Sequence, residues 1–197
     1  MSNTNAPNGF QYFGRLEGGS PTEGQTARLI ASADTAAVGS GDPVTSLNTG
    51  YVTLSTAGTT QIDGIFIGCR YLSTAIGRVI ETNYWPGSGA NGDVTAFLST
   101  DPQAVFQAQS NNTAIVFADI GANINFVAGT PNSTTGFSAA ALDQSTIATT
   151  NTLPFRIVGL LSDAGPPGAS GTDNANPYNR VLVSANNWDR KSLTGIV

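Results

Sequence analysis

The sequence contains no histidine, and this absence excludes much of the chemistry that enzymes use. Histidine is the commonest general base and metal ligand, and the Ser-His-Asp triad requires it. The single cysteine, Cys69, excludes a disulfide within the chain and leaves too few ligands for a zinc site. Cys69 lies in an apolar run and is predicted to be a small core residue. We therefore expect no enzymatic activity, no cofactor and no metal.

Charged residues are also scarce, at 11% of the 197 residues, whereas a typical domain has about 25%. The basic residues are spread along the chain and form no cluster that could hold phosphates, so we expect no nucleic acid as a partner. The surface must be covered by Ser, Thr, Asn, Gln and Gly. Such a surface is typical of proteins that bind other proteins, although it also fits an ordinary β protein with an uncharged polar surface.

Long hydrophobic runs are absent as well. No apolar segment approaches the roughly 20 residues of a membrane-spanning helix, so no membrane association is expected. The first residues contain neither a positively charged region nor an apolar stretch, and they do not resemble a signal peptide. We expect synthesis and folding in the cytoplasm of a host cell.

Short apolar or alternating segments, separated by Gly, Pro, Asp and Asn, predict many short strands. The 23 glycines and 10 prolines are scattered, which excludes long helices. Strands are expected within residues 27–30, 51–54, 62–72, 78–85, 94–98, 104–109, 113–120, 124–127, 155–161 and 180–184, and residues 41–44 are expected to begin another. Residues 138–143 are the best candidate for a short helix. The fold class predicted is mainly β: a compact antiparallel β-barrel or sandwich of short strands with long loops.

Three regions are predicted. Residues 1–27 form an extended N-terminal arm, residues 28–185 form the β core, and residues 186–197 form a C-terminal tail. Residues 164–178, rich in Pro, Gly and Asn, are expected to be a long loop. Aromatic residues in the arm and tail gain by being buried somewhere, so the candidate protein-interface residues are Phe10, Tyr12, Phe13 and Trp188. The alternative for each of them is packing onto the protein's own β core.

Several stretches, taken in order, resemble a family of small virion structural proteins encoded near the major capsid gene of tailed bacteriophages, especially short-tailed ones. The resemblance covers nearly the whole chain and is carried by residues 5–10, 41–44, 65–71, 84–86, 94–97, 101–109, 142–143 and 153–159. Each stretch alone is short, and the specificity lies in their order and spacing. The family has no catalytic residues, so the resemblance assigns none to this chain.

The resemblance implies a capsid decoration, or cement, protein on the outside of the virion head. Its expected partners are the major capsid protein and itself, as a homotrimer in preference to a homodimer. Two alternatives remain open at this point. One is another virion component, such as a tail, adaptor or head-fibre protein. The other is a carbohydrate-binding module that uses Tyr84, Trp85 and Trp188 to stack on sugars.

Overall fold

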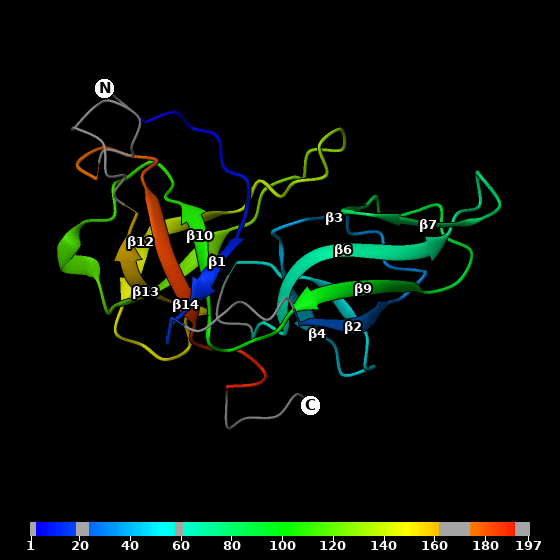
Figure 1. The fold of residues 1–197 in the computed structure, drawn as a ribbon, viewed down its shortest axis with the longest axis horizontal. Helices are drawn as coiled ribbons and strands as arrows, with labels where there is room; N and C mark the ends of the chain where they lie inside the picture. Colours follow the sequence, from blue (N-terminus) through cyan, green and yellow to red (C-terminus); the bar gives the residue numbers. More distant parts are fainter. Residues whose placement is uncertain (1–2, 19–23, 58–60, 162–173, 192–197) are drawn as a thin grey trace.

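In the computed structural model, residues 3–18, 24–57, 61–161 and 174–191 are described, and their strands form two antiparallel sheets that lie at opposite ends of the long axis (Figure 1). One six-stranded sheet, here sheet A, has the order β1-β10-β14-β13-β11-β12. Its strands are β1 (Gln11–Arg15), β10 (Ala104–Gln109), β14 (Arg180–Ala185), β13 (Phe155–Leu160), β11 (Asn123–Val127) and β12 (Ala141–Ala148).

The other sheet, sheet B, has the order β2-β9-β6-β4-β5, with β7 paired to the far end of β6. Its strands are β2 (Gln25–Ile30), β9 (Val94–Ser99), β6 (Gly64–Leu72), β4 (Pro43–Ser46), β5 (Val52–Leu54) and β7 (Val79–Thr82). A short ribbon of β3 (Val38–Gly39) and β8 (Tyr84–Trp85) lies beside sheet B. The prediction of a mainly β, antiparallel fold is therefore confirmed; the sheets do not close into a barrel and are compatible with a sandwich.

Each sheet has its own hydrophobic core. The core of sheet B contains Phe66, Trp85 and Leu98, and it includes alternate residues of β9, whose burial pattern follows the two-residue period of a strand. The core of sheet A is built around an aromatic cluster, described below. Ile62, just before β6, and Ile65, near the beginning of β6, belong to the core of sheet A. The long strand β6 thus connects the two halves of the molecule (Figure 1).

The N-terminal segment is part of the β fold, which corrects the predicted division at residue 28. β1 pairs with β10 as an edge strand of sheet A, and residues 25–27 already belong to β2. The Ala6 N–H donates to Gln109 Oε1 at 3.0 Å, and the Phe10 N–H donates to the Gly41 carbonyl at 2.9 Å. Gly9 has a φ of +71°, a conformation that glycine adopts without strain, and this turns Phe10 toward the core.

Two local predictions are wrong. Residues 138–143 form no helix, because Ala141 begins β12 and Ser138 is held in an irregular segment by its hydrogen bonds. Residues 113–120 form no strand: they contain the 3₁₀ turn η1 (Phe117–Asp119). The predicted C-terminal tail, residues 186–197, is also corrected in part, because Trp188 lies in the core of sheet A. Residues 164–173 of the predicted long loop, and residues 192–197 of the predicted tail, lie outside the described residues.

Candidate functional site

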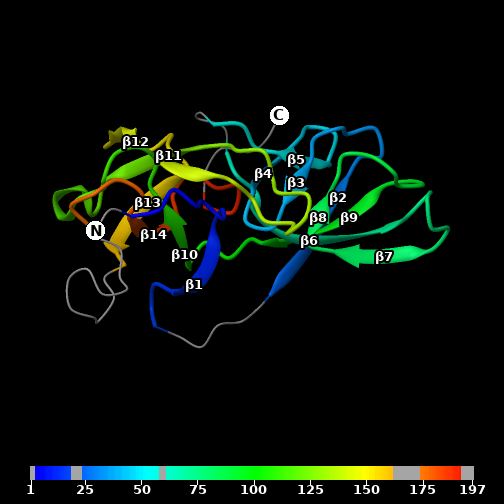
Figure 2. The same ribbon diagram turned by 90° about the horizontal axis from the view of Figure 1, so that it is seen from above.

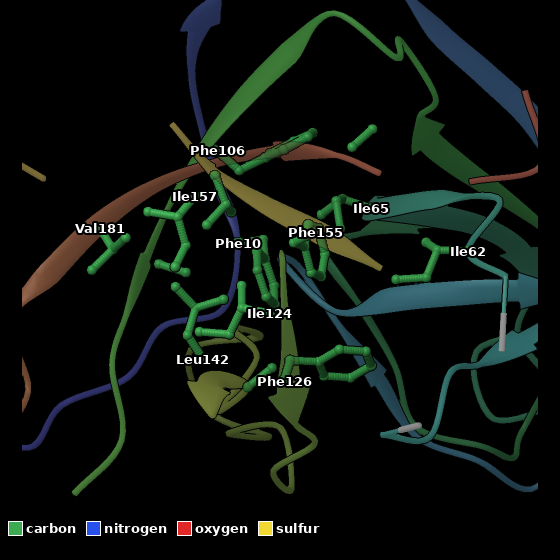
Figure 3. Close-up of a cluster of buried hydrophobic side chains, with 14 of the residues drawn as sticks. Phe10, Ile62, Ile65, Phe106, Ile124, Phe126, Leu142, Phe155, Ile157 and Val181 are labelled. Atoms are coloured by element: carbon green, nitrogen blue, oxygen red, sulfur yellow. The ribbon is translucent and has the colours of Figure 1, made fainter. Parts of the chain in front are cut away.

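Phe10 and Trp188, two of the four predicted interface residues, are fully buried in the core of sheet A. Phe10 stacks on Phe155, with ring centroids 4.3 Å apart and an angle of 12° between the planes. Trp188 meets the Phe155 ring edge-on at 6.0 Å and lies 5.8 Å from Phe106. Figure 3 shows Phe10 pointing inward between Phe155 and Ile124. This corrects the interface assignment for these two residues, which follow the alternative of packing within their own fold.

Tyr12 and Phe13 are the two predicted interface residues that a partner can reach. They are 39% and 53% exposed, on edge strand β1. Between Tyr12 and Gly14 the pairing with β10 shifts register, so Phe13 is the extra residue of a β-bulge. The Tyr12 ring lies edge-on to the Phe106 ring, with centroids 6.2 Å apart, so Tyr12 packs against the core although part of it is exposed. A bulge disturbs the regular row of backbone groups, so this edge offers aromatic side chains rather than a template for another strand.

A cleft of about 310 Å³ is lined by residues of β1, of β10 and of sheet B. In Figure 2 the ribbon of β1 lies on the side of sheet A nearer to sheet B. The lining of the cleft combines apolar, aromatic and polar residues from both sheets. The lining residues are Phe10, Gln11, Tyr12, Gly24, Gln25, Ser40, Gly41, Ile65, Phe66, Ile67, Ser99, Asp101 and Phe106. Its volume is at the lower end of the range for small-ligand pockets, roughly 300–1,000 Å³. One large side chain or a small apolar group would fit it.

Exposed apolar side chains also gather at the two ends of the molecule. At one end, the turn around η1 exposes Val116, Phe117 and Ile120, and Phe117 is 81% exposed. At the other end, the tip of the β6–β7 hairpin exposes Ile76 and the cross-strand pair Leu72 and Val79. Figure 1 shows the turn as the green segment on the left and β7 on the right. These side chains are held on regular or hydrogen-bonded elements, so their exposure is a lasting feature of the fold.

The most unusual buried polar group is Asp42, which has no exposed surface. Ser138 Oγ donates a hydrogen bond to one carboxylate oxygen, and the Gly39 N–H donates to the other at 2.8 Å. Burial raises the pKa of Asp42 to about 6, against the lowering effect of the bonds from Ser138 and Gly39. Because Gly41 also accepts from the Phe10 N–H, this carboxylate lies where the N-terminal segment, β4 and the segment before β12 meet.

A second polar cluster joins β2 to the segments before β6 and after β14. Arg28 Nε lies 2.8 Å from Oδ2 of the buried Asp63, and Arg28 also donates to Ser46 Oγ at 3.0 Å. Burial raises the pKa of the nearby Asp189, and the negative charge of Asp63 adds to this effect, while Ser46 and Arg28 oppose it. The ion pair between Arg28 and Asp63 thus links β2 to the segment before β6 within the fold.

The remaining candidates for chemistry have no reactive partner. Cys69 is buried as predicted, and burial raises the pKa of its thiol to about 12, so the thiolate is not formed at neutral pH. Trp85 and Trp188 are fully buried and offer no face for a sugar. In the described part of the chain, no three His, Cys, Asp or Glu side chains come together to hold a metal ion. No helix in that part of the chain has the length and hydrophobicity to cross a membrane.

Sequence reasoning missed both the cleft and the turn around η1. The cleft is formed by residues far apart in the chain, such as Gln11, Gln25 and Ser99, so no local sequence pattern predicts it. The turn has a detectable signal, because Asp119 follows Val116 by three residues and caps it. The apolar run Ile115–Phe117 concealed this signal by suggesting a strand.

Comparison of the chain with protein-family models, with curated proteins and with solved structures gives no significant match. The resemblance to phage decoration proteins therefore depends on the short stretches in the sequence itself.

Proposed function

We propose that this chain is a non-enzymatic decoration protein of a tailed-bacteriophage head, which binds the outside of the capsid lattice and stabilises it across subunit boundaries. The observation that carries the proposal is the placement of the exposed apolar side chains on ordered elements at separate places along the molecule: β1, the η1 turn and the β6–β7 tip. Exposed apolar side chains that gather in one place mark sites of protein association, whereas single ones are ordinary on a protein surface.

The composition supports the same proposal. A shell-binding protein must bury its surface against another protein, and uncharged polar side chains lose less on desolvation than Lys or Glu. Separated contact sites allow one molecule to touch more than one shell subunit. Because such a protein binds the closed shell and not the dissociated subunits, it stabilises the shell by mass action.

Binding to heads that lack this protein tests the proposal. Heads from a virus with the gene deleted are mixed with purified protein, and the bound copies are counted by gel densitometry and cryo-electron microscopy. We expect saturation at hundreds of copies per head and a higher temperature of head rupture. No binding, or saturation at a dozen copies or fewer, would contradict decoration; the low copy number would indicate a tail or adaptor component.

Point variants identify the contact surface better than deletion of the N-terminal segment, because Phe10 belongs to the core. Phe13→Ser removes a side chain that is 53% exposed on β1, and Leu47→Ser removes one that is 40% exposed in the turn after β4 as the matched control. If β1 faces the shell, Phe13→Ser weakens binding by about 10-fold or more, as a moderate hot spot would. Equal binding of the two variants would remove β1 from the contact.

A further inference from the structure

Sheet B has one face buried in its own core and one face open to solvent. The buried face contributes Phe66 and Leu98 to the core. Along β9 the side chains alternate between this core and the opposite face, where they are only half-buried. In Figure 1, β2, β9, β6 and β7 lie side by side, and no other described strand crosses in front of them. We call this opposite face the open face.

Strand pairing shows which side chains share the open face. Leu29 of β2 pairs with Thr95 of β9, and Thr95 also pairs with Arg70 of β6. Arg70 in turn pairs with Glu81 of β7, so these four residues form one row across the sheet. Side chains two positions along a strand return to the same face. The large apolar side chains that share the open face with this row are Leu29, Leu72, Val79 and Phe97.

The open face is more apolar than a solvent-exposed sheet face usually is. An antiparallel sheet that packs one face on a core normally presents polar side chains on the other. Here Leu29, Leu72 and Val79 are exposed and Phe97 is half-buried. These residues lie on paired strands, so a partner would bind them with little loss of backbone freedom. Apolar side chains that gather in this way mark a site of protein association.

The charges in the central row of the open face are balanced. Arg70 Nε and Glu81 Oε1 lie 3.7 Å apart and form an exposed ion pair. Nucleic acids and anionic membranes attract surfaces that have an excess of Lys and Arg. A face on which opposite charges cancel, and which is otherwise rich in apolar side chains, instead matches an uncharged surface of another protein.

The open face is also large enough to form much of an interface. β6 has nine residues, which extend roughly 30 Å, and four strands at a spacing of ~4.8 Å span roughly 15 Å, which gives an area of about 450 Å². At the end nearer sheet A, Ile67 and Ser99 line the cleft together with Tyr12 of β1. The surface therefore continues onto β1, toward the roughly 800 Å² that each partner contributes to a standard interface.

The composition of the open face favours a different protein over a second copy as its partner. Permanent homodimer interfaces resemble a core and are more apolar than interfaces between proteins that also exist apart. The open face instead carries Thr95, Arg70 and Glu81 through its centre. Such a face is compatible with water while the chain is alone, which suits a protein that folds first and docks afterwards.

We propose that the open face, continued by Tyr12, docks onto an uncharged apolar surface of the shell. The inference rests on the proposed function and names its main contact surface. The exposed residues of β1 and of the β6–β7 tip then belong to one surface, and Figure 2 shows β1 and β7 on the same side of the molecule. The η1 turn lies at the other end of the long axis from β7 and is a separate surface (Figure 1).

Binding to heads that lack this protein tests the open face with a matched pair of variants. Leu29 is 45% exposed on the open face, and Leu47 is 40% exposed in the turn after β4. Leu29→Ser is expected to weaken binding about 10-fold, and Leu47→Ser to bind as the wild type does. Combining Leu29→Ser with Val79→Ser is expected to weaken binding about 100-fold, because two strands separate the residues and their effects add.

Oxidation by hydroxyl radicals tests the same face in the wild-type protein, without any variant that must fold. Mass spectrometry measures the oxidation rate of each side chain in the free protein and in the protein bound to heads. Leu29, Leu72 and Phe97 are expected to react several-fold more slowly on heads. Leu47 is expected to react at the same rate in both states.

Three results would overturn the inference. If the wild type binds heads but Leu29→Ser and Leu47→Ser bind equally, or if the oxidation of Leu29 is unchanged on heads, the open face is not the contact surface and the decoration proposal stands without it. If the wild type does not bind heads at all, both proposals fail. If the isolated protein is a dimer that Leu29→Ser dissociates, the open face belongs to a second copy and not to the shell.

Discussion

Asp42 gives a pH dependence of stability that can be worked out in sign and size. Its pKa is about 6 in the folded protein, against 3.8 for an ordinary aspartate, and the cause is burial. Between pH 3.8 and 6 the folded state therefore binds more protons than the unfolded state, so this group makes folding less favourable as pH rises through that window. A difference of about two pKa units corresponds to about 3 kcal/mol.

The variant Asp42→Asn removes this dependence while keeping a similar shape. Its amide oxygen can accept from the Gly39 N–H, and its NH₂ group can donate to Ser138 Oγ. The free energy of unfolding is measured by urea denaturation at half-unit steps from pH 4 to 7.5. We expect Asp42→Asn to gain about 3 kcal/mol relative to the wild type over this range, because the wild type alone loses stability by ionising in the interior.

An exposed aspartate provides the control of opposite sign. The backbone N–H of Ser32 and the hydroxyl of Tyr51 donate to Asp93, and these bonds lower its pKa. Ionised Asp93 therefore stabilises the folded state above the ordinary pKa of an aspartate, and this stabilisation is lost as pH falls. The variant Asp93→Asn should flatten the acid side of the plot of unfolding free energy against pH. Parallel profiles of the wild type and Asp42→Asn would refute the reasoning, because they would mean that the buried carboxylate titrates as it does in the unfolded chain.

Three further predictions concern stability and reactivity. Phe10→Ala should destabilise the fold by about 3–5 kcal/mol in urea denaturation, while Phe13→Ala changes it by less than about 1 kcal/mol; equal effects would contradict the burial of Phe10. Arg28→Met should cost about 2–3 kcal/mol because it leaves Asp63 buried without its cation, and a neutral result would mean that the pair is unimportant. Cys69 should fail to react with a thiol reagent at pH 8 until denaturant is added, and rapid labelling of the native protein would contradict its burial.

The strands of this fold were largely predictable where the local pattern and the tertiary environment agree. Residues 94–98 are predicted as a strand, and they lie in β9, which buries alternate side chains. Residues 139–141 are three alanines, which favour a helix in isolation, but pairing with β11 draws Ala141 into β12. β1 was missed because its glycine-containing sequence has a weak strand signal, and its place at the edge of sheet A comes from pairing with distant residues.

The candidate surfaces were less predictable, since exposure depends on the whole fold. Phe10, Tyr12 and Phe13 are neighbours in sequence, yet one stacks on Phe155 and the other two reach solvent. A strand sends successive side chains to opposite faces, but which face becomes the core depends on where the strand docks. Trp188 was assigned to an exposed tail for the same reason, because the bridge between Ile62 and Trp188 joins residues far apart in the chain.

The central claim, that this chain decorates a phage head, is tested most directly by counting it in purified virus particles. Particles of the virus that encodes it are analysed by quantitative mass spectrometry, with the major capsid protein as the internal standard. The account predicts hundreds of copies per particle, in a fixed ratio to the capsid protein. Absence of the chain from the particles, or a dozen copies or fewer, would contradict it.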